Sequence, residues 1–311
     1  MRIVFMGTPE AAVPTLQRCV EDGHEVIAVW TQPDRPAGRG EKIREPPVKE
    51  FALKHGLTVE QPVKIKSAQA KDLFSSYEAD VAIVVAYGRI LPEHYLKAPK
   101  RGCINVHFSL LPDYRGAAPV NWAIVNGETK TGVSTMFIEQ ELDAGPILLQ
   151  QKTEIRPRET APELMRRLSQ LGANLLGETL NRLDDITPLP QRDRDATFAP
   201  ILKKEDGLIH WSSPATVIEN SVRGFQPWPN AYTYYKGQRL IFWAAEPLEH
   251  PDEKAGFGEV LSASGDDLLI KTGGGMALRV LELQPEAKRR MSARDFLNGT
   301  RVRTGEKFGE I

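Results

Sequence analysis

Short apolar runs alternate with amphipathic segments through the first 187 residues, and this alternation constrains the fold more than any other feature of the sequence. Strands are predicted at 2–6, 24–30, 80–85, 102–107, 131–138 and 147–155. Helices are predicted up to residue 22 and at 47–55, 67–76 and 161–183. Strands that alternate with helices usually form a parallel sheet covered by those helices. The sequence therefore predicts an α/β fold, with a Rossmann-like parallel-sheet N-terminal domain at residues 1–187.

The pattern changes after residue 187. Residues 188–207 are polar and contain Pro188, Pro190 and Pro200 without a sustained hydrophobic period, which is typical of a linker. From residue 208 onward, short alternating segments are separated by turns, including three consecutive glycines at 273–275. Because closure removes the exposed edges of short strands, we predict a small OB-like β-barrel as the C-terminal domain at residues 208–311.

Charge and cysteine content narrow the possible classes of function. The net charge is −1, so any attraction to nucleic acid has to come from local clusters. Cys19 and Cys103 are far apart in the sequence, and we expect neither a disulfide framework nor a metal site. No apolar run reaches the roughly 20 residues of a membrane span, and the first residues lack the pattern of a signal peptide. We therefore expect a soluble cytoplasmic protein, and a monomer.

Two basic clusters stand out locally. Residues 35–44 carry four basic residues and one acid, and residues 286–303 carry six basic residues and two acids. A solvated surface is the ordinary explanation of such clusters, and contact with a polyanion is the alternative. The first cluster lies in a predicted loop at residues 32–47, whose length indicates a functional role.

The strongest local pattern is a pair of polar residues at the end of a predicted buried strand. Asn105 and His107 are two residues apart, so their side chains project from the same face of that strand. The chain then turns at Pro112 and Gly116. Open α/β sheets bind ligands at the carboxyl ends of their strands. Because buried polar groups need partners, the pair indicates either a structural hydrogen-bond network or a catalytic site.

Two other turns follow predicted strands. Asp143 precedes Gly145 between two strands, where both residue types are ordinary. A catalytic histidine needs a carboxylate to fix its tautomer or its charge, which favours Asp143 as that partner. The turn at 85–92 offers backbone groups to a flat heterocycle, with Ile90 and Leu91 covering one face. A plain strand-to-helix connection explains the second turn equally well.

Six segments resemble the methionyl-tRNA formyltransferase family and cover nearly the whole chain. In order, they are MRIVFMGTPE, TQPDRPAGRG, VVAYGRILP, INVHFSLLPDYRGAAPVNWAI, TGVSTMFIEQELDAGPIL and RGFQPWPNAY. The segment at 107–116 is typical of formyltransferases that act on tetrahydrofolate substrates, and TQPDRPAGRG narrows the resemblance to the tRNA branch. The resemblance implies formyl transfer from 10-formyltetrahydrofolate, a co-substrate, to initiator methionyl-tRNA, with no metal and no covalent formyl-enzyme.

The resemblance also implies roles for particular residues. Asn105, His107 and Asp143 match the catalytic trio of the family. The expected folate-binding residues are Tyr87, Gly88, Ile90, Leu91, Ser109, Leu110, Leu111 and Pro112. Arg39 matches a basic position used on the tRNA acceptor end, and the charge of the two clusters adds Lys42, Lys288, Arg289 and Arg290 as expected phosphate contacts. Phe108 departs from the family, whose members more often carry Gly or Ala there, and is expected to reshape the rim of the pocket.

Other functions stay open at this point. A formyltransferase of the same chemistry could act on an amino-sugar nucleotide or a purine precursor, because the trio does not define the acceptor. A nucleotide-dependent oxidoreductase is suggested by a strand, Gly7 and a helix, although one glycine stands where the dinucleotide fingerprint has three. A pure RNA-binding module would explain the C-terminal barrel but not the polar trio.

Overall fold

The computed structural model describes residues 1–37, 42–250 and 254–309, which form two compact units. The N-terminal unit contains residues 1–119, 130–154 and 165–199. The C-terminal unit contains residues 120–129, 155–164 and 200–311. Two short stretches, at 120–129 and 155–164, therefore belong to the C-terminal unit although the chain returns to the N-terminal unit after each of them.

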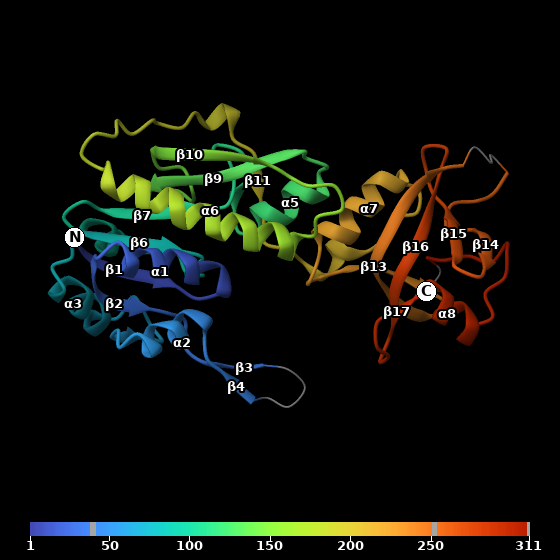
Figure 1. The fold of residues 1–311 in the computed structure, drawn as a ribbon, viewed down its shortest axis with the longest axis horizontal. Helices are drawn as coiled ribbons and strands as arrows, with labels where there is room; N and C mark the ends of the chain where they lie inside the picture. The colour runs from blue at the N-terminus through green and yellow to red at the C-terminus, as the bar shows by residue number, and fades with distance from the viewer. Residues whose placement is uncertain (38–41, 251–253, 310–311) are drawn as a thin grey trace. The chain divides into compact units, whose positions relative to one another are not determined.

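A seven-stranded sheet forms the centre of the N-terminal unit (Figure 1). Its strands are β1 (Arg2–Gly7), β2 (Glu25–Trp30), β5 (Val59–Glu60), β6 (Val81–Val85), β7 (Cys103–His107), β9 (Lys130–Phe137) and β10 (Ile147–Glu154), in the order β10-β9-β7-β6-β1-β2-β5. The neighbours from β7 to β5 are parallel, which confirms the predicted α/β fold. The strands β9 and β10 run antiparallel to their neighbours. Residues 138–146 are too few for a crossover, so β9 and β10 form a hairpin.

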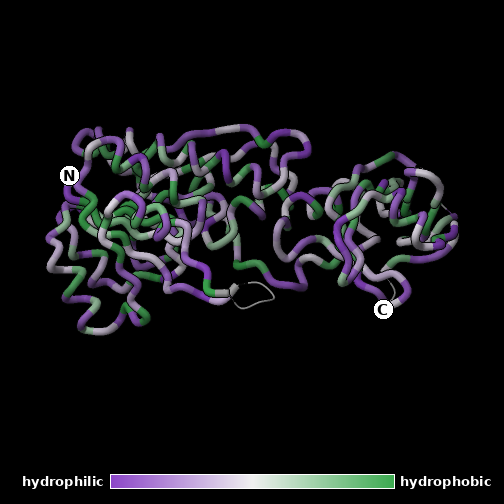
Figure 2. The backbone as a smooth tube through the Cα atoms, turned by 60° about the horizontal axis from the view of Figure 1, so that its bottom comes forward, coloured by the Kyte–Doolittle hydropathy of each residue, from purple (hydrophilic) through white to green (hydrophobic). Residues whose placement is uncertain are grey.

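Helices cover both faces of this sheet. They are α1 (Val13–Glu21), α2 (Pro47–Lys54), α3 (Ala68–Ser76), α4 (Glu93–Lys97) and α6 (Ala161–Asn181). Gly177 lets α6 approach α1, because a Cβ there would lie 2.7 Å from Nε of Arg18. On the opposite face, Trp30 packs edge-on against Phe74 of α3 and Tyr95 of α4. Figure 2 shows apolar residues along the central strands and hydrophilic residues on the outer segments.

Two segments that were predicted to be irregular contain regular structure. The loop at 32–47 includes β3 (Arg35–Ala37), which pairs antiparallel with β4 (Lys42–Arg44). The stretch at 188–207 includes the 3-10 turns η2 (Asp193–Asp195) and η3 (Lys204–Gly207), and β11 (Phe198–Ala199). Strand β11 pairs with β8 (Arg115–Gly116), and Leu189 pairs with Ile147 of β10. We call residues 189–199 the returning segment, because they lead the chain from α6 back to the turn after β7.

The C-terminal unit is built on an antiparallel sheet, which confirms the predicted β domain. Its strands are β12 (Ala231–Tyr235), β13 (Gln238–Glu249), β14 (Val260–Ser264), β15 (Asp267–Lys271), β16 (Met276–Pro285) and β17 (Met291–Ser292). They lie in the order β12-β13-β16-β15-β14, and β17 pairs with β16. Helices α5 (Pro119–Val125), α7 (Ala215–Gly224) and α8 (Ala293–Gly299) complete the described elements. In the core of this unit, Trp211 packs edge-on against Phe242 and Phe308.

Within the described parts of the chain, no helix is both long enough and apolar enough to cross a membrane. The longest described helix, α6, carries charged residues along its exposed face, including Glu163, Arg166 and Glu178.

We predict that the C-terminal unit loses stability in acid through Glu306. The carboxylate of Glu306 accepts hydrogen bonds from Nζ of Lys236 at 2.8 Å, from the Tyr235 hydroxyl and from the backbone N–H of Arg303 at 2.9 Å. These bonds, with Lys236 first, lower the pKa of Glu306 to about 2 from its ordinary 4.5. The stabilisation is therefore present above pH 4.5 and is lost as the pH falls toward 2.

Urea unfolding followed by tryptophan fluorescence between pH 2 and pH 6 measures this effect. The wild-type chain should lose more stability over that interval than Glu306→Gln, in which the titrating group is absent. Parallel losses in the two proteins would contradict the assignment.

Candidate active site

The strand β7 ends in the polar pair that the sequence pattern singled out. Asn105 pairs with Val84 of β6 and Met136 of β9, so it lies where the parallel part of the sheet meets the hairpin. Its side chain is half-buried, and no hydrogen bond to it occurs among the described residues. Most amides that are at least half-buried are hydrogen-bonded, so an unpaired side chain at Asn105 is unusual.

The two ring nitrogens of His107 face different groups, and one of them is hydrogen-bonded. The ring is 5% exposed, and its Nε2 lies 3.0 Å from the carbonyl oxygen of Tyr114. A carbonyl oxygen can only accept, so Nε2 carries the proton in this contact. The other nitrogen, Nδ1, lies 3.6 Å from Oδ2 of Asp143. The Tyr114 carbonyl therefore fixes the tautomer and turns Nδ1 toward the carboxylate.

The carboxylate of Asp143 is brought to His107 by the turn between β9 and β10. Its Oδ2 accepts a hydrogen bond of 2.9 Å from the backbone N–H of Gly116, and its side chain is 11% exposed. Asp143 has a φ of 52°, in the left-handed region, where Asp and Asn are among the better tolerated residues. Gly145 is required nearby, because a Cβ there would lie 1.9 Å from the carbonyl oxygen of Phe137.

Phe108 lies on the other face of the sheet from Asn105 and His107. Its side chain is 6% exposed, and a Cβ on Gly172 of α6 would lie 3.6 Å from its ring. The alternation of a strand explains this placement, because Val106 and Phe108 point away from the face that carries the polar pair. The expected effect of Phe108 on the pocket rim is therefore replaced by core packing under α6.

The turn after β6 lies at the switch point of the sheet, between β6 and β1, where the strand order reverses. The carbonyl of Tyr87 accepts hydrogen bonds from Oγ1 of Thr8 and Nε2 of Gln32, both at 3.1 Å. Arg89 donates from Nε to Oε1 of Gln32 at 3.0 Å. Sequence reasoning did not single out Gln32, which is the first residue of the predicted loop at 32–47 and lies in the segment TQPDRPAGRG.

The residues of this turn differ in what they expose. Ile90 is 77% exposed, whereas Leu91 and the Tyr87 side chain are buried. Burial raises the pKa of Tyr87 to about 12, and its hydroxyl has no hydrogen-bond partner among the described residues. Ala86 and Gly88 both have positive φ, at 46° and 82°, so the chain reverses twice around Tyr87. The turn therefore presents its backbone and Ile90 outward, with the tyrosine ring in the core.

The segment after His107 is tied to β9. The Ser109 hydroxyl donates to the carbonyl of Asp113 at 2.6 Å, and the Ser134 hydroxyl donates to the carbonyl of Ser109 at 2.7 Å. Leu111 is 3% exposed, while Leu110 and Pro112 keep part of their surface exposed. Among the residues at 109–112 that were expected to bind folate, Leu110 and Pro112 are therefore the ones with surface available to a ligand.

The basic residues expected to contact tRNA are distributed as follows. Lys288, Arg289 and Arg290 are exposed between β16 and β17 in the C-terminal unit. Arg290 forms an ion pair with Glu282 and lies over the ring of Trp243, 5.2 Å from its centroid. Lys42 begins β4, and only its backbone is described. Arg39 lies outside the described residues.

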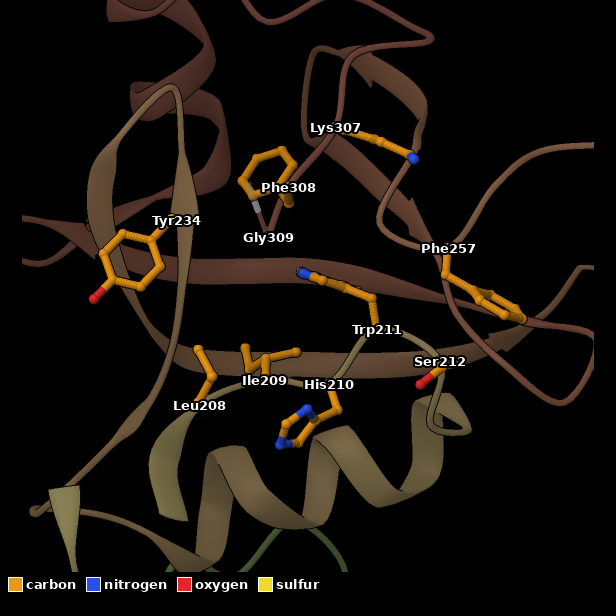
Figure 3. A pocket seen from close by; sticks show the side chains of 10 residues that line it. All are labelled: Leu208, Ile209, His210, Trp211, Ser212, Tyr234, Phe257, Lys307, Phe308 and Gly309. Carbon is orange, nitrogen blue, oxygen red and sulfur yellow. The ribbon is translucent and has the colours of Figure 1, made fainter. Parts of the chain in front are cut away.

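The C-terminal unit also contains a hollow of about 340 Å³ (Figure 3). Four aromatic side chains, Trp211, Tyr234, Phe257 and Phe308, line it together with the neighbouring Lys307 and other residues. The indole N–H of Trp211 donates to Oγ1 of Thr233 at 3.0 Å, so the polar edge of Trp211 is already satisfied. None of the lining residues is among those expected from the sequence.

Comparison with known proteins defines the class to which this fold and site belong. Residues 1–180 match the formyl transferase family, and residues 201–301 match the formyl transferase C-terminal domain. The described site therefore lies in a formyltransferase domain. A methionyl-tRNA formyltransferase of Solibacter usitatus is 49% identical over 100% of this chain and 99% of its own length. One of Caldanaerobacter subterraneus subsp. tengcongensis is 48% identical over 98% of this chain and 99% of its own.

Solved structures agree on the fold. A methionyl-tRNA formyltransferase from Clostridium thermocellum has a TM-score of 0.57 at 17% identity, over 79% of this chain and 93% of its own. An N-formyltransferase from Helicobacter canadensis, solved with folinic acid and dTDP-3-aminofucose, has a TM-score of 0.67 at 16% identity, over 89% and 98%. The chain belongs to the methionyl-tRNA formyltransferase family, because the two members named above are 48% and 49% identical to it over nearly its full length.

Proposed function

We propose that this chain transfers the formyl group of 10-formyltetrahydrofolate to the free amino group of initiator methionyl-tRNA, for translation initiation. The observation that carries the proposal is the position of Asn105, His107 and Asp143 around the carboxyl end of β7, in a chain of this family. Two titratable groups and a free amide meet there, next to the switch-point turn at 85–92. These are the groups that acyl transfer to an amine requires.

Asn105 stabilises the charge that develops during transfer. Attack of an amine on the formyl carbon gives a tetrahedral species whose oxygen carries negative charge, and donors aimed at that oxygen lower the barrier. The unpaired Asn105 amide supplies such a donor without rearrangement. Loss of one donor of this kind typically raises the barrier by about 3 to 4 kcal/mol.

Asp143 and His107 handle the proton that the attacking amine must release. The carboxylate of Asp143 is the acceptor, directly or through one water, and it keeps its place through the Gly116 N–H. His107 presents Nδ1 to the same carboxylate at 3.6 Å, so a proton received by the pair can be shared between them. No covalent formyl-enzyme is needed. Cys103, the nearest thiol in sequence, is buried, and burial raises its pKa to about 12.

The formyl donor would be held by the turn at 85–92 and the segment at 109–112. Ile90 offers an exposed apolar side chain, and the doubly reversed backbone around Tyr87 offers polar groups beside it. This combination suits a flat heterocycle with polar edges. The residues present therefore fit a folate donor, which supplies the activated formyl group. We further propose that the reaction needs no metal, and that the chain works in the cytoplasm as a monomer.

The decisive experiment mixes the purified chain with 10-formyltetrahydrofolate and methionyl-tRNA and measures formylmethionine by mass spectrometry after deacylation. We expect formylmethionine with initiator tRNA, and no formylated product when a dTDP-linked amino sugar replaces the tRNA. Formylation of the sugar and not of the tRNA would replace this proposal by the amino-sugar alternative.

Substitutions in the trio should remove activity and leave the fold intact. We expect Asn105→Ala, His107→Gln and Asp143→Asn each to lower kcat by about a hundredfold or more, the usual size of oxyanion and acid/base contributions. Asparagine tolerates the left-handed backbone of Asp143, so the third change isolates the charge. Asn181→Ala, at the exposed end of α6, is the matched control, and thermal unfolding checks the fold. A trio variant that keeps more than about a tenth of wild-type turnover would contradict the assigned role.

Binding of tRNA should depend on salt through the exposed cations between β16 and β17. Each lost phosphate contact should reduce the slope of log K against log salt by about 0.7 to 0.9. We therefore expect Lys288→Ala and Arg289→Ala to weaken tRNA binding and flatten this slope, and Lys152→Ala, on the exposed side of β10, to leave it unchanged. Filter binding at several salt concentrations measures the slope. Equal slopes in all four proteins would remove these residues from the interface.

A further inference from the structure

A side chain of the returning segment donates hydrogen bonds to the turn that carries Asp143. Nε2 of Gln191 donates to the carbonyl of Asp143 at 2.8 Å and to the carbonyl of Gly145 at 2.7 Å. The Oε1 atom of Gln191 accepts from Nε of Arg115 at 3.0 Å. One amide thus uses both of its ends: its nitrogen holds the turn of Asp143 through two hydrogen bonds, and its oxygen holds Arg115 through a third.

Arg115 occupies an unusual environment for an arginine. Its side chain is 1% exposed, although burial of a guanidinium is costly unless its donors are satisfied. Nε is bonded to Gln191, Nη1 donates to Asp193 at 3.0 Å, and Nη2 has no partner among the described residues. Both partners belong to the returning segment. Among the described residues, the side-chain hydrogen bonds of Arg115 therefore lead to the returning segment.

The returning segment also contacts the turn at Tyr114 and Arg115, on the His107 side of the site. Thr197 accepts the N–H of Tyr114 through Oγ1 at 2.8 Å and the N–H of Arg115 through its carbonyl at 2.9 Å. The same turn supplies the Tyr114 carbonyl to His107 and the Gly116 N–H to Asp143. Gly116 has no room for a side chain, because a Cβ would lie 2.5 Å from the carbonyl oxygen of Ala199.

We propose that Gln191 is a positioning residue for formyl transfer, which, braced by Arg115, holds the turn of Asp143 so that its carboxylate faces His107. This inference rests on the proposed function for its consequence in catalysis. Asp143 has a left-handed φ that costs conformational energy, and the two hydrogen bonds from Gln191 act at and just after that residue. Without them the turn relaxes and the carboxylate leaves its place between Gly116 and His107.

The kinetic test compares two substitutions at one position. Gln191→Ala removes both contacts, whereas Gln191→Glu keeps an acceptor for Arg115 and removes only the donors to the turn. We expect each to lower kcat by about 10- to 100-fold, the effect of misplacing a catalytic group by about 1 Å. The KM for the formyl donor should stay within about twofold, because the turn at 85–92 is untouched. Gln170→Ala, an exposed glutamine of α6, is the matched control.

A residue that acts only on stability would behave differently. In that case Gln191→Glu, which keeps the bond to buried Arg115, would recover turnover together with thermal stability. A double variant sharpens the distinction, because residues that act through one another are not additive. Gln191→Ala should cost less than about threefold in a chain that already carries Asp143→Asn. Full multiplication of the two losses, or recovery of turnover in Gln191→Glu, would overturn the inference.

A measurement without substrate separates this inference from the proposed function. The ring nitrogen signals of His107 are observed by NMR in histidine-labelled chain and assigned by their loss in His107→Gln. We expect Gln191→Ala to shift these signals in the same direction as Asp143→Asn. The double variant should show no further shift relative to Asp143→Asn, and Gln170→Ala should show no shift relative to the wild-type chain. Unchanged His107 signals in Gln191→Ala would refute the positioning role. Absence of product from the wild-type chain would instead refute the proposed function, and the NMR comparison would still decide the role of Gln191.

Discussion

The carboxylate of Asp143 is the point on which the rest of the site depends. It accepts the Gly116 N–H and faces Nδ1 of His107, so three separate chain segments meet at a single oxygen atom. Each segment is tied to the sheet or to its neighbours: β7 carries His107, the hairpin β9–β10 carries Asp143, and β8 carries Gly116. A left-handed backbone costs conformational energy in a residue other than glycine, and Asp143 has a φ of 52°. This cost explains why several neighbouring segments contact the turn of Asp143.

The parallel half of the sheet explains why the turn proposed to hold the formyl donor and the proposed catalytic trio lie side by side. Strands β6 and β7 are parallel neighbours, so the turn at 85–92 and the end of β7 emerge at the same edge. Thr8 and Gln32 fix the turn through its Tyr87 carbonyl, next to the switch point between β6 and β1. The proposed donor-binding turn and the proposed transfer groups are thus adjacent without any long loop. The antiparallel hairpin then adds Asp143, which a purely parallel sheet could not supply from this direction.

The sequence predicted the parts of this arrangement that depend on local periodicity. A strand period of two placed Asn105 and His107 on one face, and the alternation of strands with helices predicted the sheet. The prediction of Asp143 rested mainly on family resemblance, because its contact with His107 spans distant segments of the chain. Tyr87 illustrates the same limit in another way: the left-handed backbone at Ala86 interrupts the strand alternation and sends the tyrosine ring into the core. Gln191 could not be predicted from the sequence. Residues 188–207 are polar and contain prolines, so their composition indicates a linker and says nothing about the contacts that they make in the fold.

Local charge, rather than net charge, must account for any attraction to RNA. The chain is nearly neutral, with 40 basic and 41 acidic residues, so a long-range field cannot select a polyanion. The three basic residues at the tip between β16 and β17, Lys288, Arg289 and Arg290, differ in their surroundings. Arg290 is paired with Glu282 and lies over Trp243, whereas Lys288 and Arg289 are exposed beside it. An arginine that is already paired and stacked is less available to a phosphate, so the proposed phosphate contacts rest mainly on Lys288 and Arg289.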